Sequence, residues 1–167
     1  TVKKPFLDSA IDYASLALGS PHPAALAPFV AALVPSFPLD RAVHLVQACA
    51  AAPIGATALK AVILRGLAQL NGAPTYLDDA TTRLLQRLLS SPDTVAATLP
   101  LVARWDRTGT LIAAAQPVTR QMQRDLLDRA QTDARRAELA ASLLTLPETR
   151  PEALGAVADL LQDSVTS

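Results

Sequence analysis

Prolines cut this chain into short segments, and most of those segments place apolar residues at the spacing of an α-helix. Several of the 13 prolines fall near segment ends, and others interrupt a segment, where a proline removes a helical hydrogen bond and bends the helix. No stretch alternates polar and apolar residues between turn signals, which is the pattern of a half-buried strand. The sequence therefore predicts many short helices and almost no β-structure.

Nine segments carry the helical spacing. Their predicted limits are about 5–18, 22–34, 38–51, 54–70 and 76–89, then a segment ending near Trp105, then about 118–130, 133–145 and a last one from Pro151, with a separate short apolar stretch at 111–115. Pairs of these helices begin near residues 5, 38, 76 and 117, roughly 33–41 residues apart, which is typical of helical-hairpin repeats.

We therefore predict an all-α fold, an α-solenoid of about four to five antiparallel helix pairs, forming a single domain over residues 1–167. A closed helical bundle is the alternative, although bundles use longer and more equal helices. Composition agrees with close packing of short helices: half of the residues are hydrophobic but only 4% are aromatic, so Ala, Leu and Val must build the core. A chain of this length buries about two-thirds of its unfolded surface.

The sequence argues against nucleic acid and against membrane insertion. The 15 basic and 15 acidic residues cancel, and the arginine-rich stretch 120–136 is interleaved with aspartates, which predicts a solvated mixed-charge surface rather than the basic stripe of a nucleic-acid binder. No apolar run reaches about 18 residues without a charge or a proline, so no membrane insertion is expected. No segment resembles a signal peptide. The localisation therefore stays unassigned, and an extracytoplasmic location is compatible with the sequence.

Metal binding and nucleophilic chemistry have weak support in the sequence. His22 precedes a helix start, His44 lies on the polar side of its helix, and Cys49 is about 140° around that helix from His44. A metal site needs ligands that converge. We therefore expect two structural or exposed histidines and a small buried cysteine, which as the single cysteine cannot form an internal disulfide.

Two pairs of aspartates have a spacing that could be read as a carboxylate pair for acid–base catalysis. Asp78 and Asp79 are adjacent, so they point about 100° apart, and they are expected to place negative charge at a helix start. Asp125 and Asp128 lie one turn apart beside arginines, which favours surface ion pairs. The sequence has no glycine-rich phosphate loop, haem attachment pair or Gly-x-Ser-x-Gly elbow, so we expect no catalytic residue, metal or cofactor in this segment.

Partner binding is the function that remains, and the candidate residues are Trp105, Arg104, Tyr13 and Tyr76. Tryptophan and arginine are enriched at the centres of protein interfaces, and Trp105 and Arg104 end a predicted helix beside charged residues. Trp105 is therefore a candidate exposed anchor. The alternative is that its side chain fills a gap between two repeats.

Three stretches resemble HEAT repeats: PAALAPFVAAL at 23–33, SPDTVAATLPLVAR at 91–104 and RPEALGAVADLLQDS at 150–164. In the second stretch Asp93, Val95, Ala97 and Leu99 match the turn aspartate and the Val-x-Ala-x-Leu helix of HEAT units. Ala96 stands where those units carry an arginine, so the ladder of paired aspartates and arginines along many HEAT stacks is not expected here. The resemblance implies a non-catalytic scaffold that binds a protein partner or a neighbouring domain of the same chain.

A narrower resemblance concerns the opening PFLDSAIDYASLAL at 5–18. Its Pro5, Phe6, Leu7 and Ala10 are similar to the first helix of HEAT-like segments in large bacterial extracytoplasmic proteins. Those proteins join a sugar-dehydrogenase-like β-propeller, a helical-repeat segment and a cytochrome c module. The alternative function implied by this resemblance is the helical segment of a redox enzyme whose catalysis lies in the other modules.

The final stretch, 149–167, has the pattern of the first helix of a pair without its second helix. Leu154, Val157, Ala158 and Leu161 share one face of it, which is more apolar than the capping face of a terminal repeat. From this pattern and from the opening Thr1 we expect the chain to be a fragment of a longer protein.

Overall fold

A computed structural model describes residues 4–147 and 149–165, with side chains described at 11–39, 41–147 and 149–158. This part of the chain is all-α, with nine α-helices and no strand. The α-helices are α1 (Lys4–Leu18), α2 (Pro23–Leu33), α3 (Ala42–Ala51), α4 (Thr57–Gln69), α5 (Asp79–Leu89), α6 (Val95–Trp105), α7 (Thr110–Leu127), α8 (Asp133–Leu143) and α9 (Arg150–Val165). Three 3-10 turns, η1 (Val34–Ser36), η2 (Leu39–Arg41) and η3 (Ile54–Ala56), join α2 to α4.

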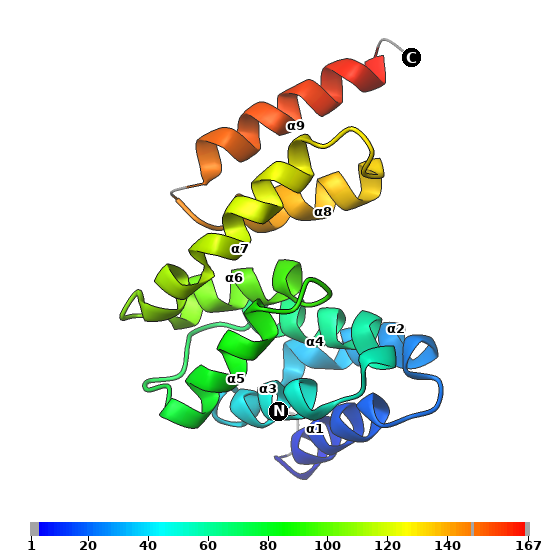
Figure 1. Cartoon of the computed structure of the whole chain (residues 1–167). Helices are drawn as coiled ribbons and strands as arrows, with labels where there is room; N and C mark the ends of the chain where they lie inside the picture. Colours follow the sequence, from blue (N-terminus) through cyan, green and yellow to red (C-terminus); the bar gives the residue numbers. More distant parts are fainter. Residues whose placement is uncertain (1–3, 148, 166–167) are drawn as a thin grey trace.

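The helices pack in two layers. In one layer α1 contacts α3, α3 contacts α5, α5 contacts α7 and α7 contacts α9, and in the other α2, α4, α6 and α8 contact one another in the same order. Each odd-numbered helix up to α7 also contacts the even-numbered helix that follows it. Figure 1 shows this progression, from α1 and α2 in blue at one end to α9 in red at the other. We call the two sets the odd layer and the even layer.

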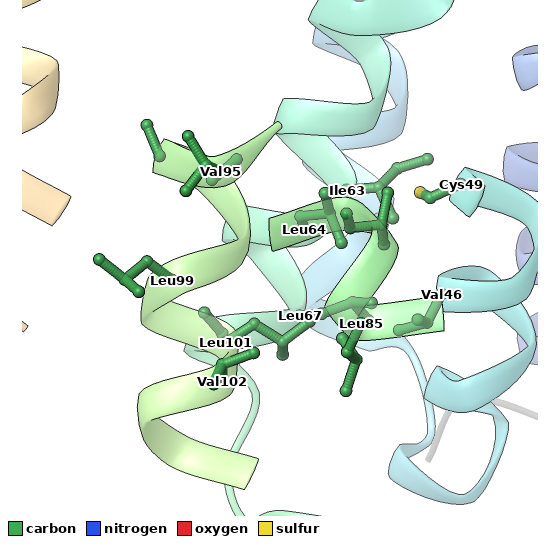
Figure 2. Packing of buried hydrophobic residues seen from close by; sticks show 14 of the residues in the cluster. Val46, Cys49, Ile63, Leu64, Leu67, Leu85, Val95, Leu99, Leu101 and Val102 are labelled. Carbon is green, nitrogen blue, oxygen red and sulfur yellow. The ribbon is translucent and has the colours of Figure 1, made fainter. Parts of the chain in front are cut away.

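Helix α6 lies at the centre of the core. Eight of its 11 residues are buried, because α4, α5, α7 and α8 all contact it. Figure 2 shows Leu101 and Val102 of α6 on the side that faces α4 and α5, Leu99 on the other side of the helix, and α3 at the right of the view. The labelled side chains are Val95, Leu99, Leu101 and Val102 of α6, Ile63, Leu64 and Leu67 of α4, Leu85 of α5, and Val46 and Cys49 of α3. As the composition predicts, this core is aliphatic.

Helix α4 approaches η1 closely at Gly66. A Cβ atom placed on Gly66 would lie 2.4 Å from Cγ1 and 2.9 Å from Cβ of Val34, and Val34 has no exposed surface. Only a residue without a side chain leaves room for this contact. The glycine therefore fixes how near α4 lies to the end of α2.

Proline inside α6 is accommodated by a side chain from α8. Pro100 has no N–H to donate to the carbonyl of Ala96, four residues earlier, and Ala96 is buried. The hydroxyl of Ser142 lies 2.7 Å from that carbonyl oxygen and donates to it. A buried backbone acceptor thus keeps a partner, and α6 and α8 are joined at this point.

Pro117 is also inside a helix, which corrects one prediction. The separate apolar stretch 111–115 and a helix at 118–130 were expected, but α7 runs without interruption from Thr110 to Leu127. The carbonyl that Pro117 leaves unpaired belongs to Ala113, whose residue is exposed, so water can pair with it. A proline whose partner carbonyl faces solvent need not end a helix.

The apolar face predicted for α9 is partly exposed. Leu154 is 53% exposed, Ala158 is exposed and Val157 is half-buried. The buried residues are instead Ala153 and Ala156. Small side chains let α9 lie close to α7 and α8, and the larger leucine is left outside. The expected position of Leu161 lies outside the side chains that the structure describes.

Candidate functional site

Trp105 is buried, which corrects the expectation of an exposed anchor. It is the last residue of α6, and only 1% of its surface is exposed, because that helix is enclosed on several sides. Its indole N–H is also buried and has no hydrogen-bond partner among the described residues. The side chain lies where α6 meets α5 and α7, which agrees with the alternative that it fills a gap between helix pairs.

The other three predicted residues do not gather at one place. Arg104 donates from Nη1 to the backbone oxygen of Ala68 at 3.0 Å, so its guanidinium supports the end of α4. Tyr13 of α1 lies edge-on to Phe29 of α2, with ring centroids 5.0 Å apart. Tyr76 is 75% exposed on the connection between α4 and α5. Of the four, only Tyr76 and Trp105 line the same hollow.

That hollow, which we call the Tyr76 pocket, has a volume of about 330 Å³. The segment 74–77 supplies one wall, the start of α5 a second, and the end of α6 with the α6–α7 turn and the start of α7 the rest. Its lining residues are Pro74, Thr75, Tyr76, Leu77, Asp79, Thr82, Trp105, Asp106, Arg107, Thr108, Thr110 and Leu111. The pocket combines an apolar interior with one basic and two acidic side chains.

Asp106 fixes the turn that forms one side of the pocket. Its Oδ2 accepts hydrogen bonds from the backbone N–H groups of Leu111 at 2.7 Å and Ile112 at 2.9 Å, so it caps the start of α7. Its Oδ1 accepts from the N–H and the hydroxyl of Thr108. Partial burial raises the pKa of this carboxyl, but the hydrogen bonds from Ile112, Thr108 and Leu111 outweigh burial and hold the pKa below its ordinary value.

Arg107, next in the chain, is exposed and forms no ion pair within the described part of the chain. Its neighbour Asp106 is occupied by the turn and by α7. Asp79 belongs to the first turn of α5, where the helix dipole favours a negative charge. Sequence reasoning did not single out Arg107, because nothing in the local pattern shows that the connection after α4 returns to lie beside it.

A second hollow, about 350 Å³ in volume, lies on the even layer. Ala96 and Pro100 of α6 and Ala134, Ala141 and Ser142 of α8 line it, together with Arg65 and Glu138. Arg65 of α4 donates to Glu138 of α8, so an ion pair spans the hollow above α6. Arg135 donates to the other oxygen of Glu138 at 2.8 Å. The partners Arg65 and Glu138 are 73 residues apart, and no local motif predicts such a pair.

The groups considered for metal binding or nucleophilic chemistry lie apart. His22 and His44 are exposed, whereas Cys49 has no exposed surface. Burial raises the pKa of the Cys49 thiol to about 12, although Lys60 lowers it in part. Among the described residues no group of three or more histidine, cysteine or acidic side chains is placed to hold a metal ion.

The aspartate pairs have structural hydrogen bonds. Asp78 caps α5 by accepting from the N–H of Thr81 at 2.7 Å, as a helix-start charge should. Asp125 accepts from the side chain of Gln121, and Asp128 accepts from the N–H of Ala130. The expected ion pairs of Asp125 and Asp128 are not found in the described part of the chain.

Within the described residues, no helix has both the length and the apolar character needed to cross a bilayer. Comparison of the chain with protein-family models, with curated proteins and with solved structures gave no match.

Proposed function

We propose that the chain is a HEAT-like α-solenoid module that binds a protein partner or a neighbouring domain of its own chain, and that it carries no catalytic centre. The observation that carries the proposal is the order of helix contacts: each helix contacts the helix two places along the chain, in both layers. Proteins built from stacked helix pairs have this order, because each pair is covered mainly by its neighbours. Such stacks present long continuous faces for binding.

The even layer is the better candidate for the binding face. Arg65 of α4 and Glu138 of α8 form an ion pair across α6, and both residues line the hollow between these helices. The floor of the hollow beneath them is lined mainly by alanine and proline, and small side chains let the backbone of a partner come close.

Site-specific photo-crosslinking tests this proposal. A benzophenone amino acid replaces Ala141, an exposed residue of α8 that lines the even-layer hollow, and in a matched control it replaces Ala113, an exposed residue of α7 in the odd layer. After irradiation in a lysate of the source cells, we expect a discrete adduct from position 141 that excess unlabelled protein suppresses, and none from position 113.

The partner identified by mass spectrometry is then titrated against the purified protein by calorimetry. Arg65→Glu is expected to weaken binding by about tenfold or more, because reversing a charge in an interface places like charges together. Partly exposed ion pairs contribute little to stability, so the variant should remain folded. Equal adducts from both positions, or an unchanged affinity for Arg65→Glu, would contradict the assignment of the even layer. The redox-enzyme alternative stays a prediction.

A further inference from the structure

We propose that the Tyr76 pocket binds a molecule that joins an apolar group to a carboxylate. The pocket lies at the start of α5 and α7 in the odd layer, away from the even-layer hollow. The proposal therefore goes beyond the scaffold function and does not rest on it. The volume of the pocket, about 330 Å³, is at the lower end of the range for small-molecule sites in proteins, about 300–1,000 Å³.

The interior of the pocket suits an apolar group. Trp105 and Leu111 are each 1% exposed and form the wall nearest the core, while Pro74, Leu77 and the ring of Tyr76 form the wall on the α4–α5 connection. Tyr76 keeps 75% of its surface exposed, although it is an aromatic side chain beside a hollow. A bound apolar group would cover that ring, and burial of apolar surface is favourable by about 25 cal/mol per Å².

Two donor groups of the lining have no acceptor. Arg107 has no ion pair in the described part of the chain, and the buried indole N–H of Trp105 has no acceptor there. Of the two carboxylates in the lining, Asp106 already accepts four hydrogen bonds from its own turn and from α7, whereas Asp79 is exposed and has no ion pair with Arg107. A ligand can supply the acceptor that Arg107 lacks, and a carboxylate matches the planar guanidinium with two parallel hydrogen bonds.

The same four hydrogen bonds hold the turn in place before any ligand arrives. Arg107 follows Asp106 directly, so the backbone that carries the guanidinium is already ordered. Less conformational entropy is then lost on binding, which favours affinity in a small site. Asp79 also lines the pocket, but it belongs to the first turn of α5, where the helix dipole favours its negative charge. Arg107 is therefore the lining residue that can pair with an anion.

Trp105 supplies the readout because it is the single tryptophan of the chain. Its indole N–H gives one resonance in a nitrogen–proton correlation spectrum of the full chain. The probes are N-acetylphenylalanine, which carries a free carboxylate, and N-acetylphenylalaninamide, which has the same apolar group without the charge. We expect the acid to shift the Trp105 resonance and to bind about tenfold more tightly than the amide, since a charge-assisted bidentate pair is added.

Two variants separate the guanidinium from general charge effects. Arg107→Gln should abolish the preference for the acid while leaving the amide affinity unchanged. Arg120→Gln is the matched control, because Arg120 is an exposed arginine of α7 outside the pocket lining, and it should keep the preference. Equal binding of acid and amide by the unmodified protein, a preference that survives Arg107→Gln, or no shift at Trp105 would each overturn the proposal.

A third probe distinguishes the two sources of such a carboxylate. The blocked dipeptide acetyl-Phe-Glu-amide carries its carboxylate on a side chain, as an acidic protein segment does. Tighter binding of this dipeptide supports a protein segment as the occupant, and tighter binding of N-acetylphenylalanine supports a free carboxylic acid. Failure of both acidic probes to shift Trp105 refutes the pocket assignment and leaves the even-layer crosslinking result unaffected.

Discussion

Replacing Gly66 by alanine should destabilise the protein, although the same change stabilises most exposed helices. Glycine in a helix interior costs about 0.5–1 kcal/mol relative to alanine, and this gain is available at any helical glycine that has free space. At Gly66 the new methyl group would lie 2.4 Å from Cγ1 and 2.9 Å from Cβ of Val34. Overpacking of this kind costs about 1–3 kcal/mol, and both contacts are too short for a small adjustment. We expect a net loss of about 1–2 kcal/mol.

Gly155 provides the matched control. It lies in α9, and a Cβ atom placed there would meet nothing within 4 Å. Gly155→Ala should therefore raise the free energy of unfolding by about 0.5–1 kcal/mol. The same substitution is thus expected to lower the free energy of unfolding at Gly66 and to raise it at Gly155, because a neighbouring side chain fills the space at the first site and the second site is open.

Urea denaturation at 25 °C, followed by circular dichroism, measures both effects from the midpoints at constant slope. Val34→Ala supplies the test of mechanism. Alone it should cost about 1.6 kcal/mol for the two lost methyl groups, but combined with Gly66→Ala it should cost less, because Cγ1, the closest clashing atom, is gone and only the 2.9 Å contact with Cβ remains. A coupling energy of about 1 kcal/mol or more is expected. Additive effects, or a Gly66→Ala variant as stable as Gly155→Ala, would refute the argument.

Three further predictions follow from buried polar groups. Ser142→Ala should lower the free energy of unfolding in urea by about 1–3 kcal/mol, because the carbonyl of Ala96 loses its partner, and Pro100→Ala should remove most of this effect by restoring an N–H at position 100; an equal cost in both backgrounds would contradict it. Asp106→Asn should cost about 0.5–1.5 kcal/mol at pH 7, because the amide keeps one acceptor oxygen but its NH2 group cannot accept the hydrogen bonds made to the second carboxylate oxygen. Because the pKa of Asp106 is lowered in the folded state, this difference should be constant above about pH 4 and should shrink as the pH falls through the folded pKa; a difference that grows as the pH falls below 4 would argue against it. Cys49, with its thiol pKa raised to about 12 by burial, should react with Ellman's reagent only after unfolding, and rapid labelling of the native protein would show that the site opens.

The all-α class and most helix positions could be predicted because they follow from local spacing. The seventh helix was divided wrongly because a sequence does not show which carbonyl a proline leaves unpaired. The carbonyl opposite Pro117 belongs to Ala113, an exposed residue, and the one opposite Pro100 accepts from Ser142 of another helix, and both helices continue. The face of α9 that packs on the chain did not follow from the sequence for a related reason: Ala153 and Ala156 are buried and Leu154 is exposed, because small side chains fit a close helix contact better than leucine does. Local hydrophobicity ranks side chains by transfer energy and does not rank them by available space.

The candidate site was predicted only in part. Tyr76 and Trp105 were singled out as aromatic residues, and the structure places them on one pocket, but their contact depends on the path of the α4–α5 connection. Arg107 was missed because its importance arises from what surrounds it: an aspartate already occupied by its own turn and an indole without an acceptor. The Arg65–Glu138 pair likewise depends on the packing of α4, α6 and α8, which no short-range pattern encodes.

The prediction of a solvated surface at residues 120–136 holds for some of its arginines and fails for one. Residues 120–136 were predicted as a solvated surface, and Arg120, Arg124 and Arg129 are exposed, but Arg136 is only 8% exposed. Four basic side chains donate to backbone oxygens at or just after the C-terminal ends of other helices: Lys60 to Ala52, which follows α3, Arg104 to Ala68 of α4, Arg136 to Leu126 of α7 and Arg150 to Leu144, which follows α8.

A positive charge at the C-terminal end of a helix is favoured by the helix dipole and supplies partners for the last carbonyls. In each of the four cases the donor lies on one helix and the acceptor at the end of another, so these charges join neighbouring helices: three pairs are successive along the chain, and Arg104 joins α6 to α4. Four of the 15 basic residues therefore hold helices together. Arg107 differs from these four because it has no ion pair in the described part of the chain and lines a pocket, and this combination is the reason to test that pocket first.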